Sequence, residues 1–152
     1  MTRAYARELA VHLIYAQGFT GDEPAEVVST RLDKAYYGKL AEENDVYVER
    51  PTRVQLAYLD NVVGGVANRV DELNEQIAKF SIDWDITRIS RLTRSIMQLA
   101  VFEILYVEDV PTGVAISEAV RIAKKYDGDD TGAFVNGILG SFARSLTTED
   151  EA

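Results

Sequence analysis

The sequence predicts an all-α protein, a compact bundle of six or seven helices. Along most of the 152 residues, apolar side chains recur at spacings of three and four, which is typical of helices with one buried face. Pro and Gly residues separate these runs, and we find no alternating apolar and polar run bounded by turns. Helices packed on helices, without a sheet, are therefore expected.

The first two helices are expected in residues 3–18 and 24–40. The first contains an apolar stripe at helical spacing, and Thr2 stands where an N-cap residue is expected. Pro24 suits the first position of the second helix because its fixed φ is already helical. The polar residues 41–50 are predicted to form a connection.

The next two helices are expected in residues 51–80 and 86–106. Gly64 and Gly65 interrupt the first of these, and each glycine costs a helix about 1 kcal/mol relative to alanine. Such a pair indicates either a close approach of another helix or a kink. Trp84 is expected to anchor the turn between the two helices.

Two further helices complete the expected bundle. Pro111 ends the preceding helix, and the next is expected from residue 114 to residue 127. Thr131 is the expected N-cap of the last helix, whose apolar period continues nearly to the end of the chain. We expect residues 1–148 to form one domain and the acidic residues 149–152 to form a disordered tail.

The composition narrows the classes of function. The chain has no Cys and a single His, which leaves little material for a zinc site or a His-based triad. The absence of Cys fits a cytoplasmic protein. The net charge is −9, and acidic residues outnumber basic ones between residues 22 and 85. An acidic surface argues against strong, unaided binding to nucleic acid, although it allows a local basic patch.

No group of residues in the sequence predicts catalysis, a metal or a cofactor. The acidic cluster at residues 127–130 lacks the spacing of a calcium loop, so a solvated interhelical loop is the better interpretation. Asp83 and Asp85 flank Trp84 without a neighbouring base. His12 stands between apolar residues, and packing explains it better than a ligand role.

Three residues of the first helix are candidates for binding. Arg3 and Arg7 are four positions apart and therefore neighbours on one helix face, where they could hold phosphate near the helix start. A solvated pair is the alternative. Tyr15 lies off the apolar stripe and either contacts a partner or is half-buried.

Three segments of the chain resemble the NusB family of transcription antitermination factors. They are Arg3–Tyr15, Arg88–Tyr106, and Asp109–Tyr126 followed closely by FVNGIL at residues 134–139. The similarity spans nearly the whole chain. It is weakest from about residue 20 to residue 53, where this sequence is longer than is usual in the family.

The resemblance implies a fold of two packed helical subdomains and a cytoplasmic protein without catalytic activity, metal or cofactor. It also implies partners. Members of the family pair with the ribosomal protein NusE, and the pair binds boxA RNA as part of the RNA polymerase antitermination complex, chiefly in ribosomal RNA operons. The function expected from the resemblance is therefore read-through of terminators.

The resemblance implies site residues by position. For RNA binding these are Arg3, Arg7, Asp130 and Phe134. For binding to NusE they are Tyr15, Thr93 and Arg94. Phe134 has two interpretations, since its ring could fill the interface between the last two helices or stack on a base.

The sequence departs from the family in two ways. Only two arginines stand where many relatives have several, so we expect weaker RNA binding and more dependence on NusE. Thr93 replaces an acidic residue that relatives often have. Two alternatives stay open: a protein-binding adaptor that has lost RNA binding, and a homodimer whose RNA surface is occluded.

Overall fold

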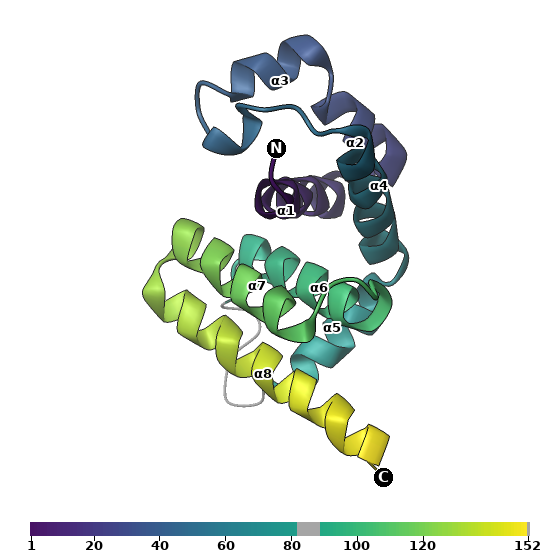
Figure 1. Cartoon of the computed structure of the whole chain (residues 1–152), viewed down its shortest axis with the longest axis vertical. Helices are drawn as coiled ribbons and strands as arrows, with labels where there is room; N and C mark the ends of the chain where they lie inside the picture. The colour runs from purple at the N-terminus through teal and green to yellow at the C-terminus, as the bar shows by residue number, and fades with distance from the viewer. Residues whose placement is uncertain (82–88, 152) are drawn as a thin grey trace. The chain divides into compact units, whose positions relative to one another are not determined.

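The fold was analysed in a computed structural model that describes residues 1–81 and 89–151. The regular structure of these residues consists of eight α-helices and one 3-10 helix. They form two compact units, Met1–Asn68 and Arg69–Ala152 (Figure 1). The predicted all-α class is confirmed. The helices outnumber the six or seven expected because two of the predicted helices are each divided.

The N-terminal unit is assembled around its first helix. Its elements are α1 (Arg3–Thr20), α2 (Pro24–Arg31), α3 (Lys34–Leu40), the 3-10 helix η1 (Asp45–Tyr47) and α4 (Arg53–Asn68). Helix α1 packs against α2, η1 and α4. The buried apolar residues of α1 and α4 include Leu9, Leu13, Leu59, Val62, Val63 and Val66. This core fixes the helices that carry the N-terminal candidate residues.

Both predicted signals at the start of this unit are confirmed. The side chain of Thr2 accepts a hydrogen bond from the backbone N–H of Tyr5 and so caps α1. Pro24 is the first residue of α2. Helix α1 continues past residue 18 and ends at Gly21, whose φ of 73° is the left-handed conformation that glycine adopts most readily.

The prediction of one helix over residues 24–40 is wrong. The chain leaves helical geometry after Arg31, and the Asp33 side chain accepts a hydrogen bond from the N–H of Tyr36, which starts α3. An Asp inside a helical pattern can cap a new helix instead of continuing the old one. The predicted connection at residues 41–50 also contains η1, with Val46 and Tyr47 buried.

The single helix predicted over residues 51–80 is likewise two helices. Helix α4 ends at Asn68, Arg69 has φ −126° and ψ 21°, and α5 covers Val70–Lys79. Asp71 and Glu72 in the first turn of α5 suit the positive end of a helix dipole. Gly64 is helical, and nothing lies within 4 Å of the position of a Cβ atom there, so no other helix closely approaches the backbone at Gly64.

The C-terminal unit comprises α5 and three longer helices. These are α6 (Arg91–Tyr106), α7 (Thr112–Asp127) and α8 (Asp129–Glu151). Helix α6 packs against α5, α7 and α8, and α7 packs along α8 (Figure 1). The buried apolar residues of the C-terminal unit include Leu73, Ile77, Ile96, Met97, Leu99, Ile122, Leu139 and Phe142.

Helix α6 begins later than the predicted residue 86. Ser90 is its N-cap and accepts a hydrogen bond from the N–H of Thr93 over 3.0 Å, so Arg91 is the first helical residue. The turn expected around Trp84, with Asp83 and Asp85, lies outside the described residues.

The α7–α8 corner is tighter than predicted. Gly128, with φ 93°, is the only residue between the two helices, so α8 begins at Asp129 and Thr131 lies inside it rather than capping it. Helix α8 extends to Glu151 and so includes most of the segment that we expected to be a disordered tail. At Gly132, a Cβ atom would lie 2.5 Å from Cγ of Lys124, which shows how closely the two helices pack.

None of the helices within residues 1–81 and 89–151 has the length and apolar character that a bilayer-spanning segment requires.

Candidate functional site

The two arginines of α1 do not form the exposed pair that the sequence suggests. The guanidinium carbon of Arg3 lies 4.1 Å from the centre of the Tyr58 ring, a cation–π contact with α4. Arg7 is only 4% exposed. Arg3 is partly exposed beside this ring, whereas Arg7 offers a ligand almost no surface.

The α7–α8 corner brings together the two candidates of the C-terminal unit. Asp130 is exposed in the first turn of α8, and Phe134 follows it with a partly exposed ring. Lys124 and Lys125, exposed in the last turn of α7, border the same corner. These lysines were not among the residues predicted to bind RNA, although two adjacent lysines beside a helix end are visible in the sequence.

Thr93 belongs to a hydrogen-bond network inside the C-terminal unit. Its hydroxyl donates to Oδ2 of Asp127 over 2.6 Å, and Oγ of Ser90 lies 3.0 Å from the same carboxylate oxygen. Only 2% of Thr93 is exposed. The residue joins the start of α6 to the end of α7, and in this structure it offers a partner almost no surface.

The other two candidates for protein binding have accessible side chains. Tyr15 is exposed on α1. Arg94 is partly exposed on α6, where it borders a small pocket of about 350 Å³ between α5 and α6. Asp71 and Glu75 line the same pocket, so its charge is mixed.

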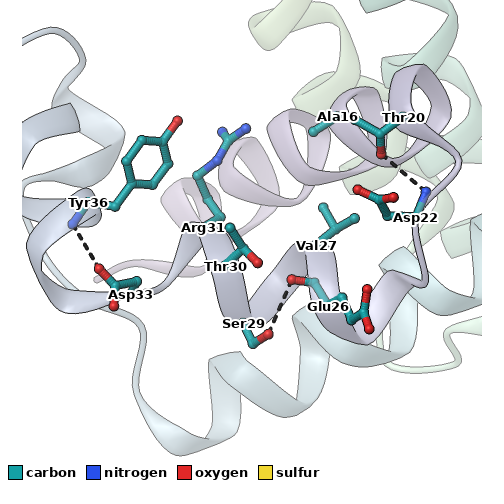
Figure 2. Close-up of a pocket in the computed structure, with 10 residues that line it drawn as sticks. All are labelled: Ala16, Thr20, Asp22, Glu26, Val27, Ser29, Thr30, Arg31, Asp33 and Tyr36. Atoms are coloured by element: carbon teal, nitrogen blue, oxygen red, sulfur yellow. Dashed lines mark hydrogen bonds between the residues drawn. The ribbon is translucent and has the colours of Figure 1, made fainter.

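A larger groove in the N-terminal unit was not predicted. It has a volume of about 610 Å³ and is lined by the end of α1, the following turn, α2 and the start of α3 (Figure 2). The lining residues are Ala16, Thr20, Asp22, Glu26, Val27, Ser29, Thr30, Arg31, Asp33 and Tyr36. The groove therefore contains three carboxylates and one guanidinium.

Two buried tyrosines support this groove from the side of η1. The Tyr37 hydroxyl donates to the backbone oxygen of Glu49 over 2.6 Å. The Tyr47 hydroxyl accepts a hydrogen bond from Nη1 of Arg31 over 2.8 Å and lies 2.7 Å from Nδ1 of His12. These bonds tie α1 and α2 to η1, and a further bond from the Tyr37 hydroxyl to the backbone oxygen of Val46, over 3.3 Å, ties α3 to η1. The contact of His12 with Tyr47 agrees with the packing role expected for it.

Burial changes the acidity of both tyrosines. Desolvation raises the pKa of Tyr37 to about 12, with the nearby Tyr47 adding to the effect. Burial also raises the pKa of Tyr47, and the Arg31 guanidinium acts against this rise. The folded N-terminal unit therefore favours the neutral form of both phenols.

The stability of the protein is expected to fall at alkaline pH. The pKa of Tyr37 lies above its ordinary value of 10.0, so its contribution is complete below pH 10 and is lost as the pH rises toward 12. The rise of the Tyr37 pKa from 10.0 to about 12 corresponds to a contribution of at most about 3 kcal/mol to the free energy of unfolding. Urea unfolding measures the free energy of unfolding at about pH 8 and about pH 11. The decrease between these two pH values should be smaller for Tyr37→Phe than for the unsubstituted chain. Tyr15→Phe, at an exposed position, should lose as much as the unsubstituted chain; an equal loss in all three proteins would contradict the assignment.

Comparison with protein families gives one match that covers most of the chain. The model of the NusB family matches residues 4–144. The transcription antitermination protein NusB of Acetivibrio thermocellus is 35% identical over 144 residues, which are 95% of this chain and 90% of that protein.

Solved structures with the same fold include T. maritima NusB, with a TM-score of 0.74 and 25% sequence identity over 95% of this chain and 92% of the other. A second is a chain from the crystal structure of the antitermination factors NusB and NusE in complex with dsRNA. Its TM-score is 0.71 and its identity 22%, over 94% of this chain and 96% of that one. At this identity, the second similarity concerns the fold alone.

Proposed function

Because the chain belongs to the NusB family of transcription antitermination proteins, which are not enzymes, we propose that it binds boxA-type RNA together with the ribosomal protein NusE. The assembly would promote read-through by RNA polymerase, chiefly in ribosomal RNA operons. The observation that carries this proposal is the family match over residues 4–144. The fold shared with a chain of the NusB–NusE–dsRNA complex supports it.

The α7–α8 corner has the chemistry that RNA binding requires. Lys124 and Lys125 can neutralise phosphates and release counterions. The partly exposed ring of Phe134 can stack on an unpaired base, and the Asp130 carboxylate can accept hydrogen bonds from base amino groups. We therefore place the main RNA contact of the C-terminal unit at this corner.

The N-terminal arginines contribute less to this proposal than their spacing suggested. Arg3 retains exposed surface beside Tyr58, but Arg7 is buried. Since each phosphate contact adds to affinity through counterion release, the chain alone should bind RNA weakly. NusE would supply the remaining contacts, because joining two weak sites raises their combined affinity.

Tyr15 and Arg94 are proposed to contact NusE directly. Both have accessible side chains, on α1 and α6 respectively. Thr93 would act from behind Arg94: its hydrogen bond to Asp127 fixes the start of α6, and Arg94 is the next residue.

Binding to fluorescein-labelled boxA RNA tests the proposal. Fluorescence anisotropy should show weak binding by the chain alone and much tighter binding with NusE, and both should weaken as salt is raised. A scrambled RNA of equal length is the control for sequence preference. Absence of RNA binding with and without NusE, at both low and high salt, would contradict the proposal.

A second candidate function is a protein-binding adaptor with no RNA contact of its own. The burial of Arg7 and the stacking of Arg3 on Tyr58 favour it. Binding of NusE with no difference in RNA affinity between NusE alone and the pair would identify the chain as such an adaptor.

A further inference from the structure

The groove between α1, α2 and α3 carries a charge pattern that the RNA and NusE proposals do not use. Asp22, Glu26 and Asp33 contribute three carboxylates to its lining, and Arg31 contributes the one positive charge. None of the residues assigned above to RNA or NusE lines this groove. We propose that it binds a Lys- and Arg-rich segment of a protein partner other than NusE.

The carboxylates are arranged along the groove rather than gathered at one point. Asp22 lies in the turn after α1, Glu26 in the first turn of α2, and Asp33 at the start of α3 (Figure 2). A segment with several positive side chains could meet them one after another. Carboxylates form short, charge-assisted hydrogen bonds with Lys and Arg.

The groove also has an aromatic surface. The Tyr36 ring is exposed and lines it next to Arg31 (Figure 2). Phe19 is 69% exposed and lies three residues after Ala16, so the two residues are neighbours on the surface of α1. Aromatic faces attract the cationic groups of Lys and Arg and accommodate the apolar stems of these side chains.

Arg31 does not cancel this pattern. Its guanidinium already donates to the Tyr47 hydroxyl over 2.8 Å and lies 5.9 Å from the centre of the Tyr36 ring. It therefore belongs to the wall that holds α2 against η1. The carboxylates outnumber it, so the groove keeps a negative potential toward an entering ligand.

Charge and size decide which occupant fits. The phosphates of RNA and the headgroups of an anionic membrane would be repelled by the carboxylates. A second copy of this chain carries the same net charge of −9 and is a poor match. A volume of about 610 Å³ is in the range of sites that hold several side chains or a drug-sized ligand, far more than one ion needs. A basic peptide segment satisfies both conditions.

The probe for the test is a fluorescein-labelled peptide of alternating lysine and serine, with a glutamate–serine peptide as its negative counterpart. Anisotropy with the full chain should show binding of the lysine peptide only. Amide NMR shifts should concentrate at Thr20, Val27 and Thr30. Failure of the lysine peptide to bind, or shifts spread over the acidic surface, would overturn the proposal.

A matched pair of variants separates the groove from general acidity. Asp22→Asn with Glu26→Gln should weaken peptide binding about fivefold, as expected when two exposed charge pairs are lost. Glu43→Gln with Asp60→Asn removes the same charge from exposed positions outside the groove lining and should leave binding unchanged. Equal weakening in both variants would show diffuse attraction and overturn the proposal. Circular dichroism confirms that each variant is folded.

A further experiment tests whether NusE itself occupies the groove. The lysine peptide should bind equally well when the chain is saturated with NusE in the absence of RNA, and the groove variant should keep its affinity for NusE and boxA RNA. Loss of peptide binding on assembly would assign the groove to the NusE surface and overturn the claim of a further partner. Because the peptide is tested against the chain alone as well, this result is independent of whether the proposed function holds.

Discussion

Replacing Val66 by Asp will unfold the N-terminal unit under conditions in which the unsubstituted chain is folded. Val66 is 2% exposed and belongs to the buried face of α4 with Leu59, Val62 and Val63. A carboxylate there would lose its hydration without a compensating charge, which costs several kcal/mol. The whole stability of a typical domain is about 5–15 kcal/mol, so one such substitution removes much of it.

Val54→Asp is the matched control because it makes the same change on the same helix. Val54 is 76% exposed, and substitutions at exposed positions usually change stability by no more than about 0.5 kcal/mol. Circular dichroism melting of both variants measures the difference. A melting temperature of Val66→Asp close to that of Val54→Asp would show that the buried face of α4 has been assigned wrongly.

Replacing Phe134 by Ala should weaken RNA binding by roughly 5- to 150-fold, which corresponds to the loss of one stacked base at about 1–3 kcal/mol. The ring is partly exposed beside Asp130, so the structure gives it surface for a base. The same partial burial means that the variant should also lose some stability, though less than the about 3–5 kcal/mol expected for a fully buried ring.

Phe142→Ala distinguishes the two roles. Phe142 lies on the same helix, is 1% exposed and packs edge-on against Phe80 with ring centres 6.1 Å apart. This variant should lose about 3–5 kcal/mol of stability but bind RNA normally at a temperature where it remains folded. Normal binding of both RNA and NusE by a stable Phe134→Ala variant would remove Phe134 from the proposed site.

Local chemistry explains why most helix positions could be predicted. Thr2, Pro24 and Gly128 act within one turn of the chain, as an N-cap, a first helical residue and a helix stop. Such signals depend on adjacent residues and are visible in the sequence. Val66 and Leu59, which are buried in α4, follow the apolar period of residues 51–80, because apolar residues at helical spacing lie on one face of a helix.

The two helix breaks could not be predicted from that period. The apolar stripe continues from Val66 to Leu73, seven residues later, across the break at Arg69. A spacing of seven residues is about two turns of one continuous helix. Two shorter helices that each bury one of these residues would show the same spacing, so the sequence pattern does not distinguish them. At Asp33 the choice was between an exposed side chain in one helix and the cap of a second, and packing decides between these outcomes.

The candidate site was harder to predict than the fold. The spacing of Arg3 and Arg7 placed both on one helix face but said nothing about which neighbours cover that face. Tyr58, which receives the Arg3 guanidinium, is 55 positions away in the sequence. The groove also could not be predicted from sequence spacing, because α1, α2 and α3 form its walls only after they pack.

The contact between Gly132 and Lys124 couples these two positions in evolution. A Cβ atom at position 132 would lie 2.5 Å from Cγ of Lys124, closer than carbon atoms approach in packed proteins. Rotation beyond Cγ leaves this overlap in place, so alanine at position 132 requires either another χ1 rotamer of Lys124 or a side chain without Cγ at position 124. An ancestor or descendant with alanine at position 132 would therefore present the cationic group of position 124 from a different place, or lack it, at the corner that we propose binds RNA.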